Sequence, residues 1–323
     1  MLEDQGTQLG GNFIPPVYGI PDDFVPPVDD SITIAASETW HLPRSVWRDI
    51  RKRVTGKSIR VAVLDTGYSA HHSLPVPIAA ESFIRGQSVG DGNGHGTHCC
   101  GTVLSRDEDI GVAPEADLIV GKVLSNQGSG SSSGIASGID WALSQGADVI
   151  SMSLGGGSSY GPTNAAIRRC MDAGTWVVVA AGNSGFSGRG NTIGWPARSG
   201  ESICTGATQA SGRIAGFSSG GQQLTWACPG QQILSCSNRG SGYVMMSGTS
   251  MATPFGAGLA ALIIELMRRE GGAAMTGVQA ITEFIKRIAE DRGPVGHDPS
   301  FGHGVPVASA IVEALAEDDL KWL

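Results

Sequence analysis

Short apolar runs that alternate with helical segments constrain this chain more than any other feature. The runs are rich in β-branched residues and span 59–64, 118–123, 149–152, 176–181 and 203–205. Runs of this kind are typical of central strands that a parallel sheet buries on both faces. Helical patterns cover 135–143, 164–171, 250–270, 278–290 and 307–316. The βαβ repetition predicts an α/β fold, a three-layer α/β/α sandwich with a mostly parallel central sheet.

The first 45 residues follow a different pattern. They hold three proline clusters between positions 15 and 27, with several Asp residues and no sustained hydrophobic periodicity. Because such a segment cannot bury a core of its own, residues 1–45 are predicted to form an extended arm. Residues 46–323 are predicted to form a single folded domain.

Composition and charge exclude several classes of partner. The formal net charge is −8, which opposes binding to phosphate backbones, so no nucleic acid is expected. The longest apolar stretches, 176–181 and 259–264, are far shorter than the ~20 residues that span a bilayer, so no membrane is expected. The N-terminus carries Glu3 and Asp4 and lacks the basic region of a signal peptide. If Met1 is the natural start, a cytoplasmic location is expected.

The cysteine pattern predicts reduced thiols. Six cysteines stand at 99, 100, 170, 204, 228 and 236, with no CxxC pair and no histidine at zinc-finger spacing. A zinc site is therefore not expected. In a chain with a full core, we expect buried free cysteines rather than a disulfide framework.

Polar residues follow three of the apolar runs directly. Asp65 follows the first run, Ser153 follows the third, and Gly182 and Asn183 follow the fourth. In doubly wound sheets, ligands bind beyond the carboxyl ends of the strands. These residues are therefore expected to meet at one edge of the sheet.

Two further motifs carry residues suited to amide hydrolysis. His95 lies in Asp91-Gly-Asn-Gly-His-Gly-Thr-His98, and Ser250 lies in Gly248-Thr-Ser-Met-Ala-Thr-Pro254. The reaction needs a nucleophile, a base, a carboxylate that orients the base, and donors for the developing oxyanion. Each residue alone has a structural alternative: a turn for Asp65, a helix-face pair or half a metal site for the two histidines, and a helix N-cap for Ser250.

Together, and in the order Asp, His, Ser, these motifs resemble the subtilisin-like serine proteases. The resemblance runs from about Trp47 to Val312 and includes the segments 111–114, 151–156, 180–183 and 302–307. It implies a serine endopeptidase that forms an acyl-enzyme and requires no cofactor. By the resemblance, Asp65 orients the base, His95 is the base and then the acid, Ser250 is the nucleophile, and Asn183 donates to the oxyanion. His98 has no role in the motif and is expected to be a packed histidine. The other histidines outside the motif are expected at the surface or in turns: His71, His72, His297 and His303.

The resemblance also implies a substrate cleft with two rims. Gly128, Ser129 and Gly130 form one rim, and Ser153, Leu154 and Gly155 form the other. An extended peptide would add between them as a strand. The pocket beyond is walled by 153–156 with Gly182 and Asn183, and has Gly194 at its base. Since no acidic residue stands in these stretches, large apolar P1 residues are expected.

Two alternatives to an endopeptidase remain at this point. Gly130-Ser-Ser-Ser-Gly134 matches the nucleophile elbow of α/β-hydrolases and would make Ser132 the nucleophile of an esterase. The match lies in a Gly/Ser-rich segment that is expected to be a loop, whereas an elbow needs a preceding strand. The second alternative is a peptide-binding scaffold of the same fold without turnover, which is disfavoured because every catalytic position is filled.

Three features set the chain apart within that family. Its arm is too short for the folded prodomain of secreted members and is closer to short-armed intracellular subtilisins, in which an N-terminal extension blocks the cleft; residues 13–18 resemble that segment. An inert or docking arm is the alternative. Cys99 follows the catalytic histidine motif as in proteinase K-like members. The family's tight calcium site is predicted to be absent, because the loop after Thr102 is shorter and His72-Ser-Leu74 stands where a carboxylate is expected. The acidic residues 107–109 are expected to form a solvated turn near Arg106 rather than a weak surface site for an ion.

Overall fold

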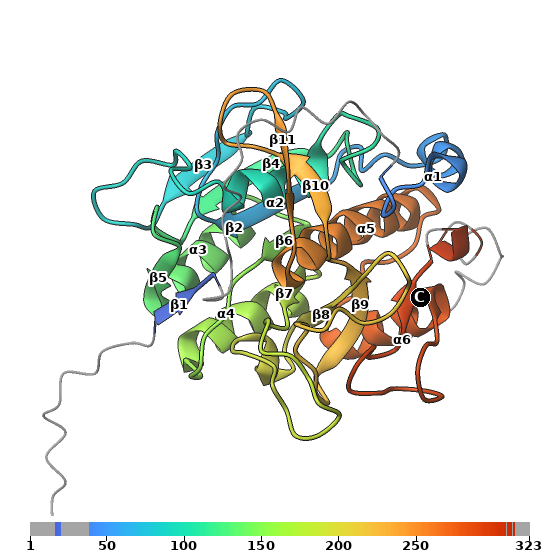
Figure 1. The fold of residues 1–323 in the computed structure, drawn as a ribbon. Coiled ribbons are helices and arrows are strands. Elements are labelled where there is room, and N and C mark those ends of the chain that lie inside the picture. Colours follow the sequence, from blue (N-terminus) through green and yellow to red (C-terminus); the bar gives the residue numbers. More distant parts are fainter. Residues whose placement is uncertain (1–16, 21–38, 308, 312, 314–323) are drawn as a thin grey trace, which may run out of the picture.

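A seven-stranded parallel sheet forms the centre of the protein in the computed structural model shown in Figure 1. The structure describes residues 17–20, 39–307, 309–311 and 313. The strands of the sheet stand in the order β3-β4-β2-β6-β7-β8-β9. Their bounds are β2 Arg60–Asp65, β3 Ala79–Ser82, β4 Asp117–Lys122, β6 Val149–Met152, β7 Trp176–Ala180, β8 Ile203–Thr208 and β9 Leu224–Pro229. The predicted α/β/α sandwich with its parallel sheet is confirmed.

The chain forms this sheet because its central strands are apolar on both faces. All five residues of β7 and all four of β6 are buried. In β2, Val63 pairs with Val120 of β4 on one side and with Ser151 of β6 on the other. The next strands along the chain thus lie on opposite sides of β2. A ligand crevice is therefore expected near the carboxyl end of β2.

Helices cover the sheet on both faces. Helices α2 (His95–Leu104) and α5 (Thr249–Arg269) pack against each other, and α5 crosses strands β6 to β9. Helices α3 (Ser132–Ser144) and α4 (Gly161–Asp172) pack together and contact β2 and β7. Helix α6 (Val278–Ile288) lies beside β9. The short helix η1 spans Ala197–Ser199, and the helix predicted at 307–316 lies partly outside the described residues.

Three two-stranded antiparallel sheets flank this core. In one, β10 (Ile233–Cys236) pairs with β11 (Tyr243–Met246). In another, β12 (Ala289–Glu290) pairs with β13 (Val305–Pro306). The third joins β1 (Val17–Gly19), from the predicted arm, to β5 (Ser129–Ser131).

The packed domain begins earlier than the predicted boundary at residue 46. Thr39, His41 and Leu42 are buried, although the sequence assigned them to the arm. Helix α1 (Arg44–Arg51) follows and buries Trp47 and Ile50. Composition does not mark this boundary, because the segment before Pro43 shows no sustained hydrophobic periodicity. Leu42 and Trp47 nevertheless belong to the hydrophobic core.

Helix α5 belongs to the core in spite of its composition. Among the described residues it is the one helix long and apolar enough to cross a membrane, and its most apolar window is 100% buried inside the protein. All six cysteines are also buried and free, as the sequence predicted.

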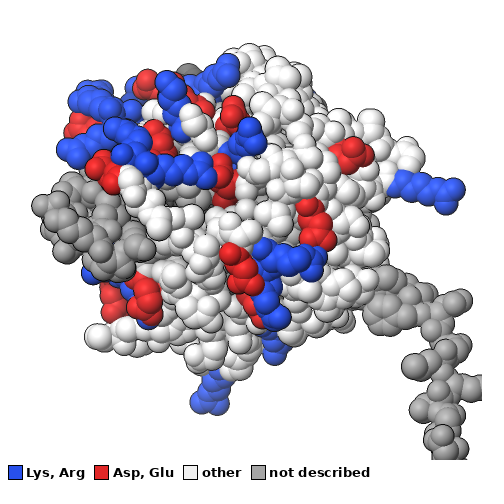
Figure 2. Space-filling model, turned by 180° about the vertical axis from the view of Figure 1, so that it is seen from behind, with Lys and Arg blue, Asp and Glu red and all other residues white. Residues whose placement is uncertain are grey.

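Basic and acidic side chains are mixed on the face of the molecule that is hidden in Figure 1. Figure 2 shows Lys and Arg gathered at one corner with Asp and Glu among them. Of the basic residues on α1 and at the end of α5, Arg44 pairs with Asp109, and Arg268 pairs with Asp148. Lys52 pairs with Asp49 on α1 itself. Much of the positive charge of this corner is therefore neutralised locally.

Candidate active site

Asp65 lies at the carboxyl end of β2 and is almost completely buried, with 1% of its surface exposed. Its Oδ1 lies 2.7 Å from His95 Nδ1 and also accepts a hydrogen bond from the backbone N–H of Thr66 at 2.7 Å. The carboxylate therefore holds the imidazole by its Nδ1 side. This leaves Nε2 as the ring atom suited to proton transfer.

His95 is the first residue of α2, and two glycines bring the helix close enough for this contact. Gly94 precedes the helix with φ 106°, a conformation that favours glycine. A Cβ on Gly96 would stand 2.4 Å from the carbonyl oxygen of Gly67, in the turn after Asp65. The absence of a side chain at Gly96 thus allows α2 to approach the end of β2.

Asp91 organises the start of α2 and is a residue to which the sequence analysis gave no role. Its Oδ1 accepts hydrogen bonds from Thr66 Oγ1, Asn93 N and Gly94 N, at 2.8, 3.0 and 2.8 Å. Its Oδ2 accepts from Thr97 N and Oγ1, at 2.8 and 2.6 Å. Burial raises the pKa of Asp91, but the hydrogen bonds from Gly94 and Thr97 outweigh it, so the net shift is downward.

Thr66 and Lys122 connect Asp91 to the catalytic strand. Thr66 Oγ1 donates to Asp91 and accepts from Gly96 N at 2.9 Å, so one hydroxyl joins β2 to α2. Lys122, at the end of β4, is fully buried and donates from Nζ to the Thr66 carbonyl and to Asn126 Oδ1. Burial lowers the pKa of Lys122, and the nearby carboxylates of Asp91 and Asp65 oppose that shift.

Ser250 lies in the first turn of α5 and is 2% exposed. Pro254 stands four residues later and has no N–H, so it cannot close the usual helical hydrogen bond to the Ser250 carbonyl. That carbonyl instead accepts from Ser153 Oγ at 2.7 Å and contacts Cys99 Sγ at 3.6 Å. Among the described residues, none hydrogen-bonds to Ser250 Oγ.

The contacts of Cys99 show that Ser250 and His95 lie close together. Its Sγ is 3.9 Å from His95 Nδ1 as well as 3.6 Å from the Ser250 carbonyl oxygen. Burial, with the neighbouring Asp65 carboxylate, raises the pKa of the Cys99 thiol well above its usual value. Three side chains of the kinds that bind metals, Asp65, His95 and Cys99, have their possible ligand atoms within 4.8 Å of one another. In the described part of the chain this is the one group of three or more Asp, Glu, His or Cys side chains placed so closely.

Asn183 lies beside the start of α5, beyond the end of β7. Its Oδ1 accepts from Thr249 N at 2.9 Å and from Thr249 Oγ1 at 3.0 Å. Its Nδ2 lies near Gly248, 3.2 Å from where a Cβ on that glycine would stand. With its oxygen engaged by the backbone, the amide presents its N–H groups beside Ser250, as an oxyanion donor requires.

The two predicted rims lie on either side of residues 17–20. Gly19 exchanges two hydrogen bonds with Gly155, of 3.0 and 3.1 Å, and Ile20 N donates to Gly128 O at 2.9 Å. Tyr18 is opposite Gly130 in the β1–β5 pairing. Its hydroxyl donates to Ser158 O at 3.0 Å, and its ring is fully buried.

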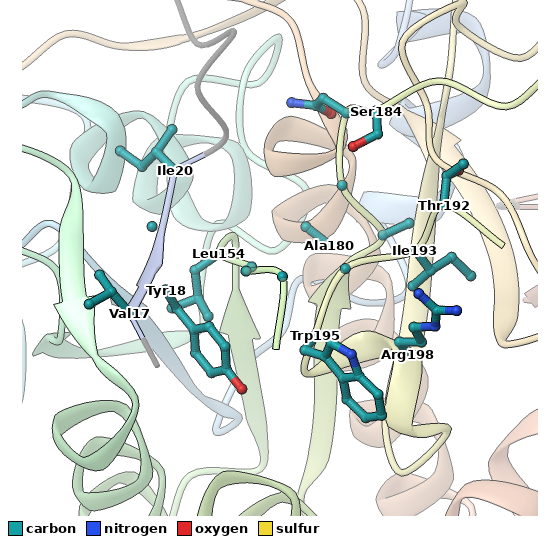
Figure 3. Close-up of a pocket in the computed structure, with 18 of the residues that line it drawn as sticks. Val17, Tyr18, Ile20, Leu154, Ala180, Ser184, Thr192, Ile193, Trp195 and Arg198 are labelled. Atoms are coloured by element: carbon teal, nitrogen blue, oxygen red, sulfur yellow. The ribbon is translucent and has the colours of Figure 1, made fainter. Parts of the chain in front are cut away.

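A cavity of about 760 Å³ adjoins the rims and Asn183. Figure 3 shows Leu154 and Tyr18 on one side of it and Ile193, Trp195 and Arg198 on the other. The lining includes most of the predicted substrate residues: Gly128, Ser129, Leu154, Gly155, Gly182, Asn183 and Gly194. Gly130 and Ser153 are not among its lining residues, since Gly130 pairs within β5 and Ser153 holds the Ser250 carbonyl.

Two other histidines of the sequence motifs are structural. His98 is fully buried and its Nε2 lies 3.0 and 3.2 Å from the carbonyl oxygens of Ile233 and Val244, in the β10–β11 hairpin. The expectation of a packed histidine is confirmed. His71, expected at the surface or in a turn, is instead buried and bonds to Ser73 Oγ and to Gly242 O.

Ser132 does not form an exposed elbow. A strand, β5, does precede it, which corrects the expected loop, but Ser132 begins α3 with no exposed surface. Its carbonyl accepts from Thr163 Oγ1 at 3.1 Å. Because β5 precedes Ser132, a missing strand no longer disfavours the elbow. Ser132 is disfavoured because the contacts of Asp65, His95 and Cys99 converge on Ser250 instead.

The residues at the position of the family calcium site do not fit that ion. Leu74 is 5% exposed and apolar. The loop after α2 closes on itself through Gly111 N to Asp107 O. Its acidic side chains are engaged elsewhere: Asp109 pairs with Arg44, and Asp107 Oδ2 accepts from Tyr243 OH at 3.0 Å. These partners replace the solvated turn near Arg106 that the sequence suggested.

Comparisons with known proteins agree with this geometry. A family model described as the subtilase family matches residues 56–304. Subtilisin DY of Bacillus licheniformis is 44% identical over 213 residues, which cover 65% of this chain and 77% of that protein. Alkaline elastase YaB of Bacillus sp. (strain YaB) is 38% identical over 287 residues, 87% and 72% of the two chains. M-protease of Shouchella clausii (strain KSM-K16) is 42% identical over 283 residues, 86% and 70%. The chain belongs to the subtilase family and is a subtilisin-like serine endopeptidase.

Proposed function

We propose that the chain cleaves peptide bonds through Asp65, His95 and Ser250. The observation that carries this proposal is the buried 2.7 Å contact between Asp65 and His95, with Cys99 in contact with both His95 and the Ser250 backbone. In the first step His95 Nε2 takes the Ser250 proton as Oγ attacks the carbonyl carbon. His95 then gives that proton to the leaving amine, and water hydrolyses the acyl-enzyme by the same path.

Asn183 and the start of α5 stabilise the negative charge that develops on the substrate oxygen. The amide of Asn183 is fixed through Thr249, and helix N-termini favour anions. The Asp65 carboxylate stabilises the imidazolium that forms beside it.

A fluorophosphonate probe tests this mechanism against the two alternatives. We expect labelling that Ser250→Ala abolishes and Ser132→Ala leaves intact, together with loss of casein hydrolysis in Ser250→Ala. Labelling that depends on Ser132 would support an esterase. An unlabelled wild-type protein that still binds peptides would support a scaffold without turnover.

The cavity beside Asn183 supports a preference for large apolar P1 residues. Leu154, Ile193 and Trp195 supply apolar walls, and no described lining residue carries a carboxylate. Because a buried Lys or Arg of a substrate would find no opposite charge there, cleavage after these residues is disfavoured. Comparing kcat/KM for peptides that differ only at P1, with Phe, Leu or Lys, tests the preference.

We propose that the substrate is a peptide or protein and that the N-terminal arm competes for the same cleft. The bonds from Gly19 and Ile20 to the two rims are those that an added substrate strand would make. Deleting residues 1–35 should raise the initial rate and remove any lag, whereas equal rates with and without these residues would make the arm inert.

Nucleic acid is not proposed as a partner. The basic side chains gathered at one corner in Figure 2 lie among acidic ones, and Arg44 and Arg268 form ion pairs with Asp109 and Asp148.

A further inference from the structure

Arg198 is the one charged side chain among the described residues that line the cavity. It lies in η1, four residues after Gly194, and its backbone N–H donates to the Gly194 carbonyl at 2.9 Å. This bond fixes the start of the arginine side chain relative to the base of the pocket. Figure 3 shows Arg198 on the same wall as Ile193 and Trp195, across the cavity from Leu154. Its side chain is exposed.

No described residue forms an ion pair or a hydrogen bond with the guanidinium of Arg198. The nearest acidic residue along the chain, Glu201, pairs with Arg168, whose Nε lies 3.1 Å from Glu201 Oε2. The cation of Arg198 is therefore available to a ligand. A guanidinium matches the planar geometry of a carboxylate and can bind it through two parallel N–H groups.

The surroundings of Arg198 define which side chain would reach it. The walls formed by Leu154, Ile193 and Trp195 are suited to methylene groups, whereas the arginine places positive charge on one side of the same cavity. A residue with an apolar stem and an acidic end satisfies both. Glutamate has this form, and its neutral analogue glutamine lacks only the charge.

We propose that Arg198 is a specificity-determining residue that favours substrates with a glutamate at P1. The inference rests on the proposed peptide hydrolysis and adds an acidic class of substrate to the apolar one. It also gives a second reason for poor cleavage after lysine or arginine, because Arg198 would repel a like charge in the pocket.

The test uses pairs of peptides that are identical except for Glu or Gln at P1, with the full-length protein. The ratio of the two kcat/KM values is the readout. A competing arm lowers both values by the same factor, so the ratio is independent of arm occupancy. We expect wild type to favour Glu by about fivefold at low salt, the size typical of an accessible charged pair, and less at high salt.

Variants of Arg198 should change this ratio in a charge-dependent order. Arg198→Ala should bring the ratio close to one, and Arg198→Glu should reverse it in favour of Gln. Arg168→Ala is the matched control, since it removes an equal charge that already has a partner and does not line the cavity. It should keep the wild-type ratio. The same ratio in wild type and Arg198→Ala, or an equal loss in Arg168→Ala, would overturn the inference.

A binding measurement separates this inference from the proposed hydrolysis. In Ser250→Ala, fluorescence anisotropy of the same labelled peptides gives the ratio of the Kd values without turnover. If wild type cleaves no peptide, the proposed hydrolysis fails, and the Kd ratio with and without Arg198→Ala decides the role of the arginine.

Discussion

At the residue scale, the catalytic histidine depends on a carboxylate that does not touch it. Asp91 holds the turn before His95 through five hydrogen bonds, so it acts as a positioning residue. Asp91→Ala should lower kcat by about 10- to 100-fold, because a misplaced catalytic group reacts slowly. KM should change little, since Asp91 does not line the cavity. Steady-state kinetics on a chromogenic peptide would measure both.

The control for Asp91 stands at the other end of α2. Asp107→Asn removes a carboxylate that bonds to Tyr243, outside the network at the start of the helix. We expect near wild-type kcat for this variant. If Asp91→Ala lowers stability but leaves kcat intact, its network is structural only and does not position His95.

A second residue-scale prediction concerns Cys99. A mercurial bound to its Sγ would occupy the space beside His95 and Ser250, so it should inactivate the enzyme. Reaction should be slow, because burial raises the pKa of the thiol and keeps it protonated. Cys99→Val should be active and resistant, while Cys100→Ala should remain sensitive. Full activity of a wild-type sample that mass spectrometry shows to be modified at Cys99 would contradict this prediction.

At the scale of elements, His98 ties α2 to the β10–β11 hairpin and makes stability depend on pH. Burial lowers the pKa of His98 to about 3, from an ordinary value of 6.5. The unfolded chain therefore binds a proton at pH values where the folded protein does not. This contribution to stability is complete above pH 6.5, falls as the pH drops, and levels off near pH 3.

The matched variant is His98→Gln, which can still donate to the hairpin carbonyls but does not titrate. Between pH 6 and 4 it should flatten the dependence of unfolding free energy on pH by about 1.4 kcal/mol per pH unit, the value for one proton. Urea unfolding at several pH values measures the slope. An unchanged slope would show that His98 is already protonated in the folded protein, or that it does not titrate in the unfolded one.

The elements differ in how far the sequence alone could predict them. Strands β2, β4, β6, β7 and β8 were predicted within a few residues, because each is a buried apolar run. Strand β3 was missed because its residues are largely exposed, and β10 and β11 because a hairpin depends on pairing rather than on a distinctive run. Strand β1 exists through its partner β5. The sequence placed residues 13–18 in an extended arm and likened them to a segment that blocks the cleft, but it could not give the pairing with β5.

For the whole molecule, the proposal that this chain lacks the family's tight calcium site gives a prediction about thermal stability. EDTA should leave the Tm nearly unchanged, because an ion that does not bind contributes no free energy to the folded state. Differential scanning fluorimetry with EDTA, and again after added CaCl₂, measures this. A large drop in Tm with EDTA that calcium restores would reveal a site outside the loop after α2.

The site as a whole was more predictable than the interactions that support it. Asp65, His95, Ser250 and Asn183 could be named because each lies in a motif of fixed local sequence. Asp91 and Lys122 act through contacts between elements, and Arg198 reaches the cavity only because η1 turns beside Gly194. Such contacts depend on tertiary packing, which a single sequence does not state.

The pairing of β1 with β5 has a consequence for how inhibition by the arm would depend on enzyme concentration. A competitor attached to its own enzyme has an effective concentration that does not depend on the amount of protein. Dilution would then leave self-occupancy unchanged, while a free peptide with the sequence of residues 17–20 would act only at a concentration comparable to this effective concentration. Weak substrates would be excluded at any enzyme level, and a single cut in residues 21–38 would convert a concentration-independent block into one that dilution removes.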